Sequence, residues 1–175
     1  MFNNNSRKLK LKVNESKSAV ARPSERKFLG FSFTKDKEPK RRISNQAKKK
    51  FKDQVRKLTR RKRGVSIERM SEELASYLRG WVGYYGYCQT PTVLRDLDSW
   101  LRRRLRSVVW KKWKRGRTRY TELVKRGVRP DLAAQTAGSS HGLWRISQSP
   151  ALGIALPNAY FSKLGLPSLQ ESMFV

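Results

Sequence analysis

The chain has almost no cysteine or histidine and few acidic residues. Its 175 residues include one Cys and one His, and 13 Asp and Glu stand against 41 Lys and Arg. A single cysteine, Cys88, excludes an internal disulfide and a multi-cysteine zinc site. His141 lies in a separate Gly/Ser-rich segment, so the sequence supports no Cys–His or Ser–His–Asp group. We therefore expect no metal, no cofactor and no catalysis by this chain alone.

Long apolar runs are also missing. No stretch reaches the roughly 18 consecutive apolar residues of a transmembrane helix. The N-terminal sequence MFNNNSRKLKLKVN lacks the apolar centre of a signal peptide. No glycine-rich segment has the spacing and the Lys-Ser or Lys-Thr of a phosphate-binding loop. We expect a cytoplasmic protein with no membrane partner.

Positive charge is abundant, and most of it is concentrated in two blocks. Residues 35–65 hold fifteen Lys and Arg against three acids, and residues 101–130 hold thirteen against one, so each block has a net charge of +12. Residues 66–100 hold three basic and five acidic residues, which gives −2. A solvated lysine-rich face explains one short run, but two such blocks in a chain of net charge +28 indicate a polyanion. Nucleic acid is the predicted partner.

Apolar residues recur at helical spacing in three segments, each with a recognisable start. Ser44 and Ser66 are predicted N-caps, and Thr90 followed by Pro91 predicts the start of the third helix. The first helix is expected to end near residue 61, before Gly64. The stripes expected to pack together are Ala47, Phe51, Val55 and Leu58; Leu74, Leu78 and Trp81; and Leu97, Leu101 and Leu105.

The two ends of the chain differ from this central part. Residues 8–13 and 27–33 have strand-like patterns, and residues 35–42 are expected to form a charged linker. Four short helices are expected at 118–126, 130–137, 150–156 and 157–164. The predicted fold is mainly α, with three long helices, a small C-terminal helical lobe and a short, partly unpaired N-terminal β segment. Gly80, Gly83 and Gly86 predict close approach of another helix or of a ligand backbone.

The aromatic residues fall into two groups. Tyr77, Trp81, Tyr84 and Trp100 lie at helical spacing with aliphatic residues, so we expect them in the core. Others lie near basic residues or helix ends, where stacking on an unpaired base is the alternative to packing. This second group comprises Tyr85, Tyr87, Trp110 and Trp113.

The motifs taken together resemble the C-terminal part of bacterial group II intron reverse transcriptase/maturases, over essentially the whole chain. LKVNESKSAVARPSERKFLGFSF (11–33) is similar to the end of the polymerase palm. FKDQVRKLTRRKRGVSIERMSEELASYLRGWVGYYGYC (51–88) resembles the maturase-specific domain X, or thumb, and LTRR, LRGW and YYGYC carry most of the specificity. The match continues through TPTVLRDLDSWLRRRLRSVVWKKWKR and LPNAYFSKLGLPSL.

The resemblance implies three parts and excludes one activity. Residues 1–34 correspond to a palm remnant, 35–116 to the thumb-like domain X, and 117–175 to a small helical lobe. Family members carry fingers and a palm with a metal-binding Tyr-Ala-Asp-Asp motif, and some carry an endonuclease. This chain has no Asp-Asp pair, so DNA polymerisation does not carry over. The start at MFNNNS is expected to mark a truncated or split element.

Three functional hypotheses follow from the resemblance and the charge. The first is an RNA-binding maturase-type fragment that binds group II intron RNA, with a template–primer RNA/DNA duplex as a further ligand, and assists splicing. The second is half of a split polymerase that needs a separate palm-bearing chain, and the third is a non-specific basic nucleic-acid binder. The residues expected to bind RNA are Lys48, Lys49, Lys50, Lys52, Arg56, Arg60, Arg61, Arg63, Tyr85, Arg102, Arg103, Arg106, Lys111, Trp113 and Lys114.

Overall fold

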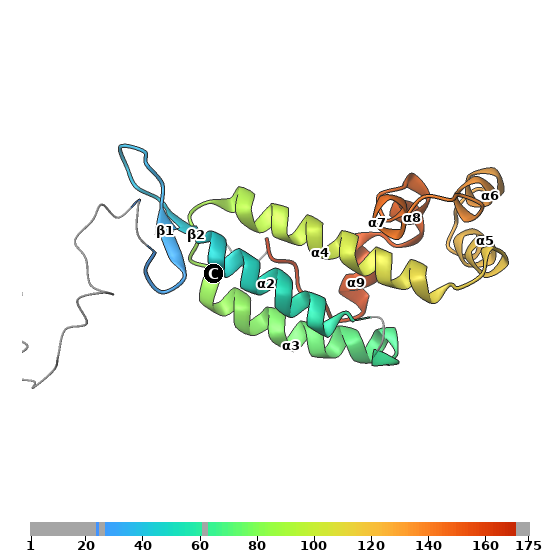
Figure 1. The fold of residues 1–175 in the computed structure, drawn as a ribbon, viewed down its shortest axis with the longest axis horizontal. Coiled ribbons are helices and arrows are strands. Elements are labelled where there is room, and N and C mark those ends of the chain that lie inside the picture. The colour runs from blue at the N-terminus through green and yellow to red at the C-terminus, as the bar shows by residue number, and fades with distance from the viewer. Residues whose placement is uncertain (1–23, 25–26, 61–62, 171–175) are drawn as a thin grey trace, which may run out of the picture.

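Three long helices form the body of the molecule. The computed structural model describes residue 24 and residues 27–60 and 63–170. Helices α2 (Asn45–Leu58), α3 (Ile67–Tyr85) and α4 (Pro91–Lys112) lie side by side, with a β-hairpin at one end and most of the small helices at the other (Figure 1). The predicted mainly α fold is confirmed.

The polar side chains predicted to start the first two long helices do so. The Ser44 hydroxyl accepts a hydrogen bond from the Ala47 N–H at 3.2 Å, and the Ser66 hydroxyl accepts one from the Arg69 N–H at 3.1 Å. Thr90 precedes α4 as predicted, but its side chain makes no capping bond. Helix α2 ends at Leu58, earlier than predicted, and the chain turns back through Gly64 at a φ of +68°.

The predicted apolar stripes meet in a single core. All of their members are buried except Leu58, which is half-buried. Aromatic rings join α2 to α3, since the centroids of Phe51 and Trp81 lie 4.6 Å apart. Trp81 is buried as predicted, whereas Tyr84 is 48% exposed and is not a core residue.

A two-stranded antiparallel hairpin precedes the helices. Strand β1 (Phe31–Phe33) pairs with β2 (Arg41–Ile43), and Phe31 lies opposite Ile43. The strand expected at 27–33 is therefore present at its C-terminal end. The linker expected at 35–42 is shorter than predicted, because Arg41 and Arg42 belong to the partner strand β2. The β segment is paired in its described part. The strand expected at 8–13 lies outside the described residues.

Five short helices complete the fold: α5 (Gly116–Lys125), α6 (Pro130–Ala137), α7 (Leu143–Ile146), α8 (Pro150–Ala155) and α9 (Asn158–Lys163). Four of them lie close to their predicted positions. Helix α7 was not predicted, because the Gly/Ser-rich sequence before it favours a loop. Its N-cap is a glycine that offers no side-chain cap.

Two expectations about absences concern the described part of the chain only. No helix there is long and apolar enough to cross a membrane. No group of three or more His, Cys, Asp or Glu side chains in that part is placed to hold a metal ion.

Close approach of another helix to Gly80 and Gly83 is contradicted, since no described atom would come within 4 Å of an added Cβ at either position.

Candidate nucleic-acid interface

Helix α2 carries six of the fifteen basic residues of the first block. Lys49, Lys50, Arg56 and the following Arg60 are exposed, whereas Lys48 and Lys52 are half-buried. This distribution follows from the helix period, because Ala47, Phe51 and Val55 turn the opposite side into the core. The cationic side chains predicted for one side of α2 are therefore accessible to solvent.

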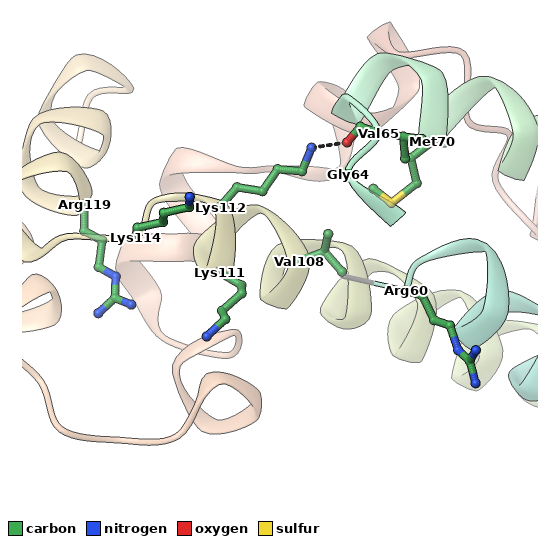
Figure 2. A pocket seen from close by; sticks show the side chains of 9 residues that line it. All are labelled: Arg60, Gly64, Val65, Met70, Val108, Lys111, Lys112, Lys114 and Arg119. Carbon is green, nitrogen blue, oxygen red and sulfur yellow. Dashed lines mark hydrogen bonds between the residues drawn. The ribbon is translucent and has the colours of Figure 1, made fainter. Parts of the chain in front are cut away.

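The two basic blocks meet at a cleft of about 500 Å³, which we call the basic cleft. Its walls come from the end of α2, the start of α3 and the C-terminal end of α4 (Figure 2). Its lining residues are Arg60, Gly64, Val65, Met70, Val108, Lys111, Lys112, Lys114 and Arg119. Five of these nine are cations and none is an acid.

Two of these cations also hold the walls of the cleft together. Lys112 reaches across to the turn before α3 and donates from Nζ to the Val65 carbonyl at 2.5 Å (Figure 2). Arg119 donates from Nε to the Trp113 carbonyl at 2.9 Å and lies 4.7 Å above the Trp110 ring. Arg60, Lys111 and Lys114 are exposed, and no described side chain of an acid is paired with them. These three are the cations best placed to meet a phosphate.

Glu68, an acid that interacts with Lys112 of the basic cleft, is held in its charged form. A hydrogen bond with its own backbone N–H, a second with the Ser66 hydroxyl and the nearby Lys112 ammonium lower the pKa of Glu68 below its ordinary value. Glu68 is in the first turn of α3, where a negative charge also suits the helix dipole. It is exposed and makes no ion pair among the described residues.

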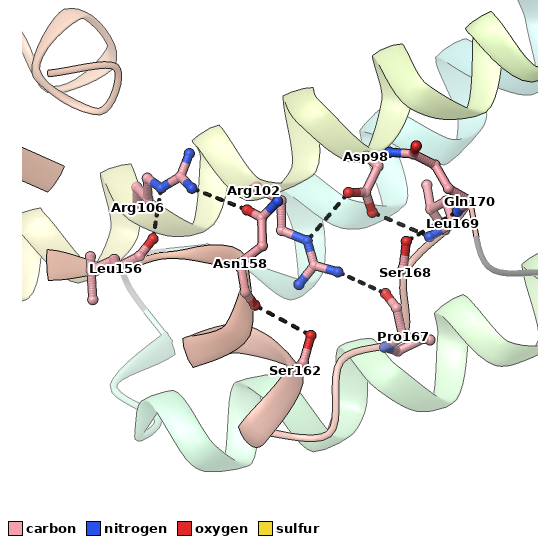
Figure 3. A network of polar contacts seen from close by, with 10 residues as sticks. All are labelled: Asp98, Arg102, Arg106, Leu156, Asn158, Ser162, Pro167, Ser168, Leu169 and Gln170. Carbon is pink, nitrogen blue, oxygen red and sulfur yellow. Dashed lines mark hydrogen bonds and ion pairs between the residues drawn. The ribbon is translucent and has the colours of Figure 1, made fainter. Parts of the chain in front are cut away.

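Arg102, predicted to bind RNA, is buried in this structure. The residue as a whole is 2% exposed, and its Nε lies 3.5 Å from the Asp98 carboxylate. Its Nη2 donates to the Pro167 carbonyl at 3.0 Å (Figure 3). Asp98 also accepts a bond from the Leu169 N–H at 3.2 Å. Arg102 therefore fastens the C-terminal segment to α4.

Arg103 and Arg106 also turn toward the C-terminal lobe rather than toward the basic cleft. Arg103 donates to the Trp144 carbonyl at 2.8 Å. Arg106 donates to the Leu156 carbonyl at 2.9 Å and to the Asn158 side chain at 3.1 Å (Figure 3). Both are half-buried, so they do not belong to the same surface as Lys111 and Lys114.

Tyr85 and Trp113, the two aromatic residues in the predicted RNA-binding set, pack against other rings. Trp113 is 8% exposed, packs edge-on against Trp110 and is covered by Arg126 at 5.0 Å. The ring of Tyr85 lies 4.7 Å from Trp81 and 5.3 Å from Phe31, which fixes the hairpin to α3. Burial raises the pKa of Tyr85 above its ordinary value. Neither ring is free to stack on RNA in this conformation.

Two further predicted residues complete the comparison. Arg63 is exposed, but its guanidinium bonds to the Leu58 carbonyl at 2.8 Å and to Glu73 at 2.6 Å. It therefore shapes the turn between α2 and α3. Arg61 lies outside the described residues.

The sequence did not single out Lys112 and Arg119, although both lie in the second basic block. Their contribution depends on the turn after α4, which folds Arg119 of α5 back toward the end of that helix. Helical spacing within α4 gives no information about that turn. Only the charge of the block itself pointed to these residues.

Clustered cations at a cleft edge can hold the closely spaced phosphates of a nucleic-acid backbone. Each neutralised phosphate releases counterions, which makes such binding strong at low salt. Lysine and arginine at the cleft would contact phosphate differently, because an arginine guanidinium can bind two phosphate oxygens at once. The arrangement supports backbone binding, which positions a nucleic acid without identifying its sequence.

Comparison with known proteins agrees with the fold and the charge. Residues 48–127 match the family model of the group II intron, maturase-specific domain. The match spans α2 to α5 and includes all of the cations of the basic cleft. It runs past residue 116, where the boundary of domain X was expected, and that boundary stays a prediction. No curated protein matches the chain. Residues 48–127 are thus similar to the group II intron maturase-specific domain, and this match supports the resemblance of the chain to the C-terminal part of group II intron reverse transcriptase/maturases.

Proposed function

We propose that this chain binds structured group II intron RNA through the basic cleft and the exposed side of α2, and so assists folding of the intron for splicing. The observation that carries the proposal is the meeting of the two basic blocks at one cleft whose lining residues include no acid. The match to a group II intron maturase-specific domain supports group II intron RNA as the class of RNA. The chain acts as a binding protein in the cytoplasm rather than as an enzyme.

A competition experiment tests this function. Filter binding across a salt series compares group II intron RNA with a scrambled RNA and with duplex DNA of equal length. A domain that responds to RNA shape keeps a preference for the intron as salt rises, whereas a general polycation binds all three alike. Equal affinities at every salt concentration would leave only a non-specific basic protein.

Charge reversal locates the surface in the same assay. Replacing Lys49, Lys50, Arg56 and Arg60 with Glu should weaken binding to every RNA, because these exposed side chains face the polyanion. The matched control reverses four exposed cations elsewhere, at Arg79, Lys125, Arg145 and Lys163. The rate of intron splicing at limiting Mg²⁺, with and without each protein, then connects binding to function. An equal loss in both variants would contradict the assigned surface.

A second candidate function is supported by the hairpin end of the molecule. Phe28 is 72% exposed and Leu29 66%, and nearby Tyr84, also exposed, donates from its hydroxyl to the Leu29 carbonyl. An exposed apolar group of this kind suits contact with a separate palm-bearing chain of a split polymerase. Primer extension on a template–primer duplex, measured after mixing such a chain with this one, is the test. No extension and no co-purification would eliminate this function.

A further inference from the structure

A second cleft lies between α4 and the C-terminal lobe, and we call it the lobe cleft. Its volume is about 440 Å³, within the usual range of small-ligand sites of roughly 300–1,000 Å³. Three arginines of α4 and two tryptophans from different elements line it: Arg102, Arg103, Arg106, Trp100 and Trp144. This combination of planar cations and large rings is separate from the basic cleft.

The charge of the lobe cleft is poorly balanced by the protein itself. Within the described part of the chain, the acceptors of Arg103 and Arg106 are uncharged oxygens, those of Trp144, Leu156 and Asn158. Among the described lining residues, Asp98 is the one carboxylate, and its two oxygens already contact Arg102 and the Leu169 N–H. An anion entering the cleft would therefore meet two guanidinium groups that no described carboxylate neutralises.

Burial adds to this imbalance. It lowers the pKa of Arg103 and of Arg106, and the neighbouring Arg102 cation lowers the pKa of Arg106 further. Arg102 itself is buried, and its Nη1 has no hydrogen-bond partner among the residues that the structure describes. Partly desolvated cations gain more from an anion than exposed ones, because water screens the attraction less. The site thus favours a phosphate on electrostatic grounds.

The tryptophans give the site an affinity for a flat ring. Trp144 is 39% exposed, and the Arg103 guanidinium lies 4.0 Å above its ring, so a stacked pair stands at the edge of the cleft. Trp100 lies on the side nearer α2, where Lys52 and Arg56 are 5.3 Å and 5.5 Å from its ring. The lobe cleft is therefore adjacent to the cationic side of α2. An RNA strand bound along the cationic side of α2 would therefore pass Trp100 and reach the lobe cleft.

We propose that the lobe cleft binds one unpaired nucleotide of RNA, with its phosphate against Arg103 and Arg106 and its base stacked on the Trp144–Arg103 pair. The proposal deepens the RNA-binding function above and takes its ligand class from it. Stacking accepts any base, since each has a π face. The site would hold a nucleotide that protrudes from a folded RNA, which is the kind of feature that separates RNA from a uniform duplex.

Mononucleotides test the site without intron RNA. Adenosine 5′-monophosphate, ribose 5-phosphate and inorganic phosphate are titrated against the full chain at low salt. The five tryptophan indole N–H resonances are followed by NMR, with that of Trp144 assigned by its absence in Trp144→Leu. The nucleotide should bind about five- to a hundredfold more tightly than ribose 5-phosphate, which corresponds to stacking worth about 1–3 kcal/mol. It should also shift the Trp144 resonance.

Two variants keep the test decisive. Trp144→Leu should abolish the difference between the nucleotide and ribose 5-phosphate. Gln148→Glu adds a negative charge at the exposed edge of the lobe cleft and should weaken all three ligands about fivefold or more. Gln135→Glu, an exposed glutamine of α6 outside the cleft, is the matched control and should change nothing. Thermal melting of each variant confirms that it is folded.

The outcomes separate this site from the proposed function. Equal affinity for the nucleotide and ribose 5-phosphate, or an equal effect of the two Gln→Glu changes, would overturn the nucleotide site. Weakened intron RNA binding after charge reversal on α2 would still support the proposed function in that case. Conversely, a nucleotide that binds and shifts Trp144 supports the site even if intron RNA shows no preference.

Discussion

The buried pair of Asp98 and Arg102 offers the sharpest test of how the C-terminal segment is attached. Asp98→Ala should destabilise the protein by about 3–5 kcal/mol, because it leaves the Arg102 guanidinium buried without its carboxylate. It also removes the acceptor of the Leu169 N–H. In a chain of this length, such a change corresponds to a fall in Tm of about 6–20 °C.

The size of the effect follows from burial rather than from the ion pair as such. The Asp98 and Arg102 side chains are 6% and 3% exposed, whereas those of Asp131 and Arg129 are 67% and 83% exposed at a similar separation. Asp131→Ala is therefore the matched control, and its cost should be at most about 1 kcal/mol. The double change Asp98→Leu with Arg102→Met should be less harmful than Asp98→Ala, since it removes both charges together.

Urea unfolding followed by circular dichroism measures all three variants. Similar costs for Asp98→Ala and Asp131→Ala would refute the structural role of the pair. RNA binding by the folded double variant tests whether Arg102 also contributes to RNA affinity. A large loss of RNA affinity without a loss of stability would return Arg102 to the binding surface.

Further predictions concern the helix core and its pH dependence, each measured by thermal or urea unfolding. Trp81→Ala should cost about 3–5 kcal/mol, because the ring is buried between Phe51 and Tyr85; an unchanged midpoint with lost RNA binding would make it a stacking surface instead. Gly80→Ala should stabilise the protein by about 1 kcal/mol, since the position is helical and open, and a loss of stability would contradict the open surface. Burial raises the pKa of Tyr77 to about 12, so the folded state holds this proton longer than the unfolded state. Its contribution to stability should therefore be present below pH 10 and lost between about pH 10 and 12. Tyr77→Phe should flatten that decline, and an unchanged pH profile would count against the burial.

The core could be predicted because the information is local. Helical spacing identified Phe51, Leu74 and Leu101, and the hydroxyls of Ser44 and Ser66 marked two helix starts. These features depend on neighbours within a few residues along the chain. Predictions made from them therefore do not depend on how elements distant in sequence are arranged.

The partners of the second basic block were harder to predict. Spacing placed Arg102, Arg103 and Arg106 on one side of α4, but which segment covers that side depends on the path of residues 138–170. The spacing of Asp98 and Arg102, four residues apart, was the available signal for a buried pair. Strand β2 was missed for a related reason, since Ile43 is its one buried residue.

The aromatic residues show the same limit. Trp113 lies between lysines in sequence and Tyr85 lies at the end of a predicted helix, and these positions suggested stacking on bases. In the structure their rings contact other aromatic rings from their own and neighbouring elements. Trp144 and Trp100, beside arginines and lysines, are the more exposed rings that meet cations at a cleft.

The salt dependence of RNA binding tests the central claim most directly, namely that the two basic blocks form one phosphate-binding cleft. Arg60, Lys111 and Lys114 are replaced together by Gln, and the control replaces the exposed Arg79, Lys125 and Lys163 in the same way, so each variant loses three charges. Loss of three phosphate contacts should flatten the slope of log K against log salt by roughly 2 to 3 in the cleft variant. The slope of the control should stay near that of the unaltered chain. Equal flattening in both variants would show that net charge alone, and not the basic cleft, binds the RNA.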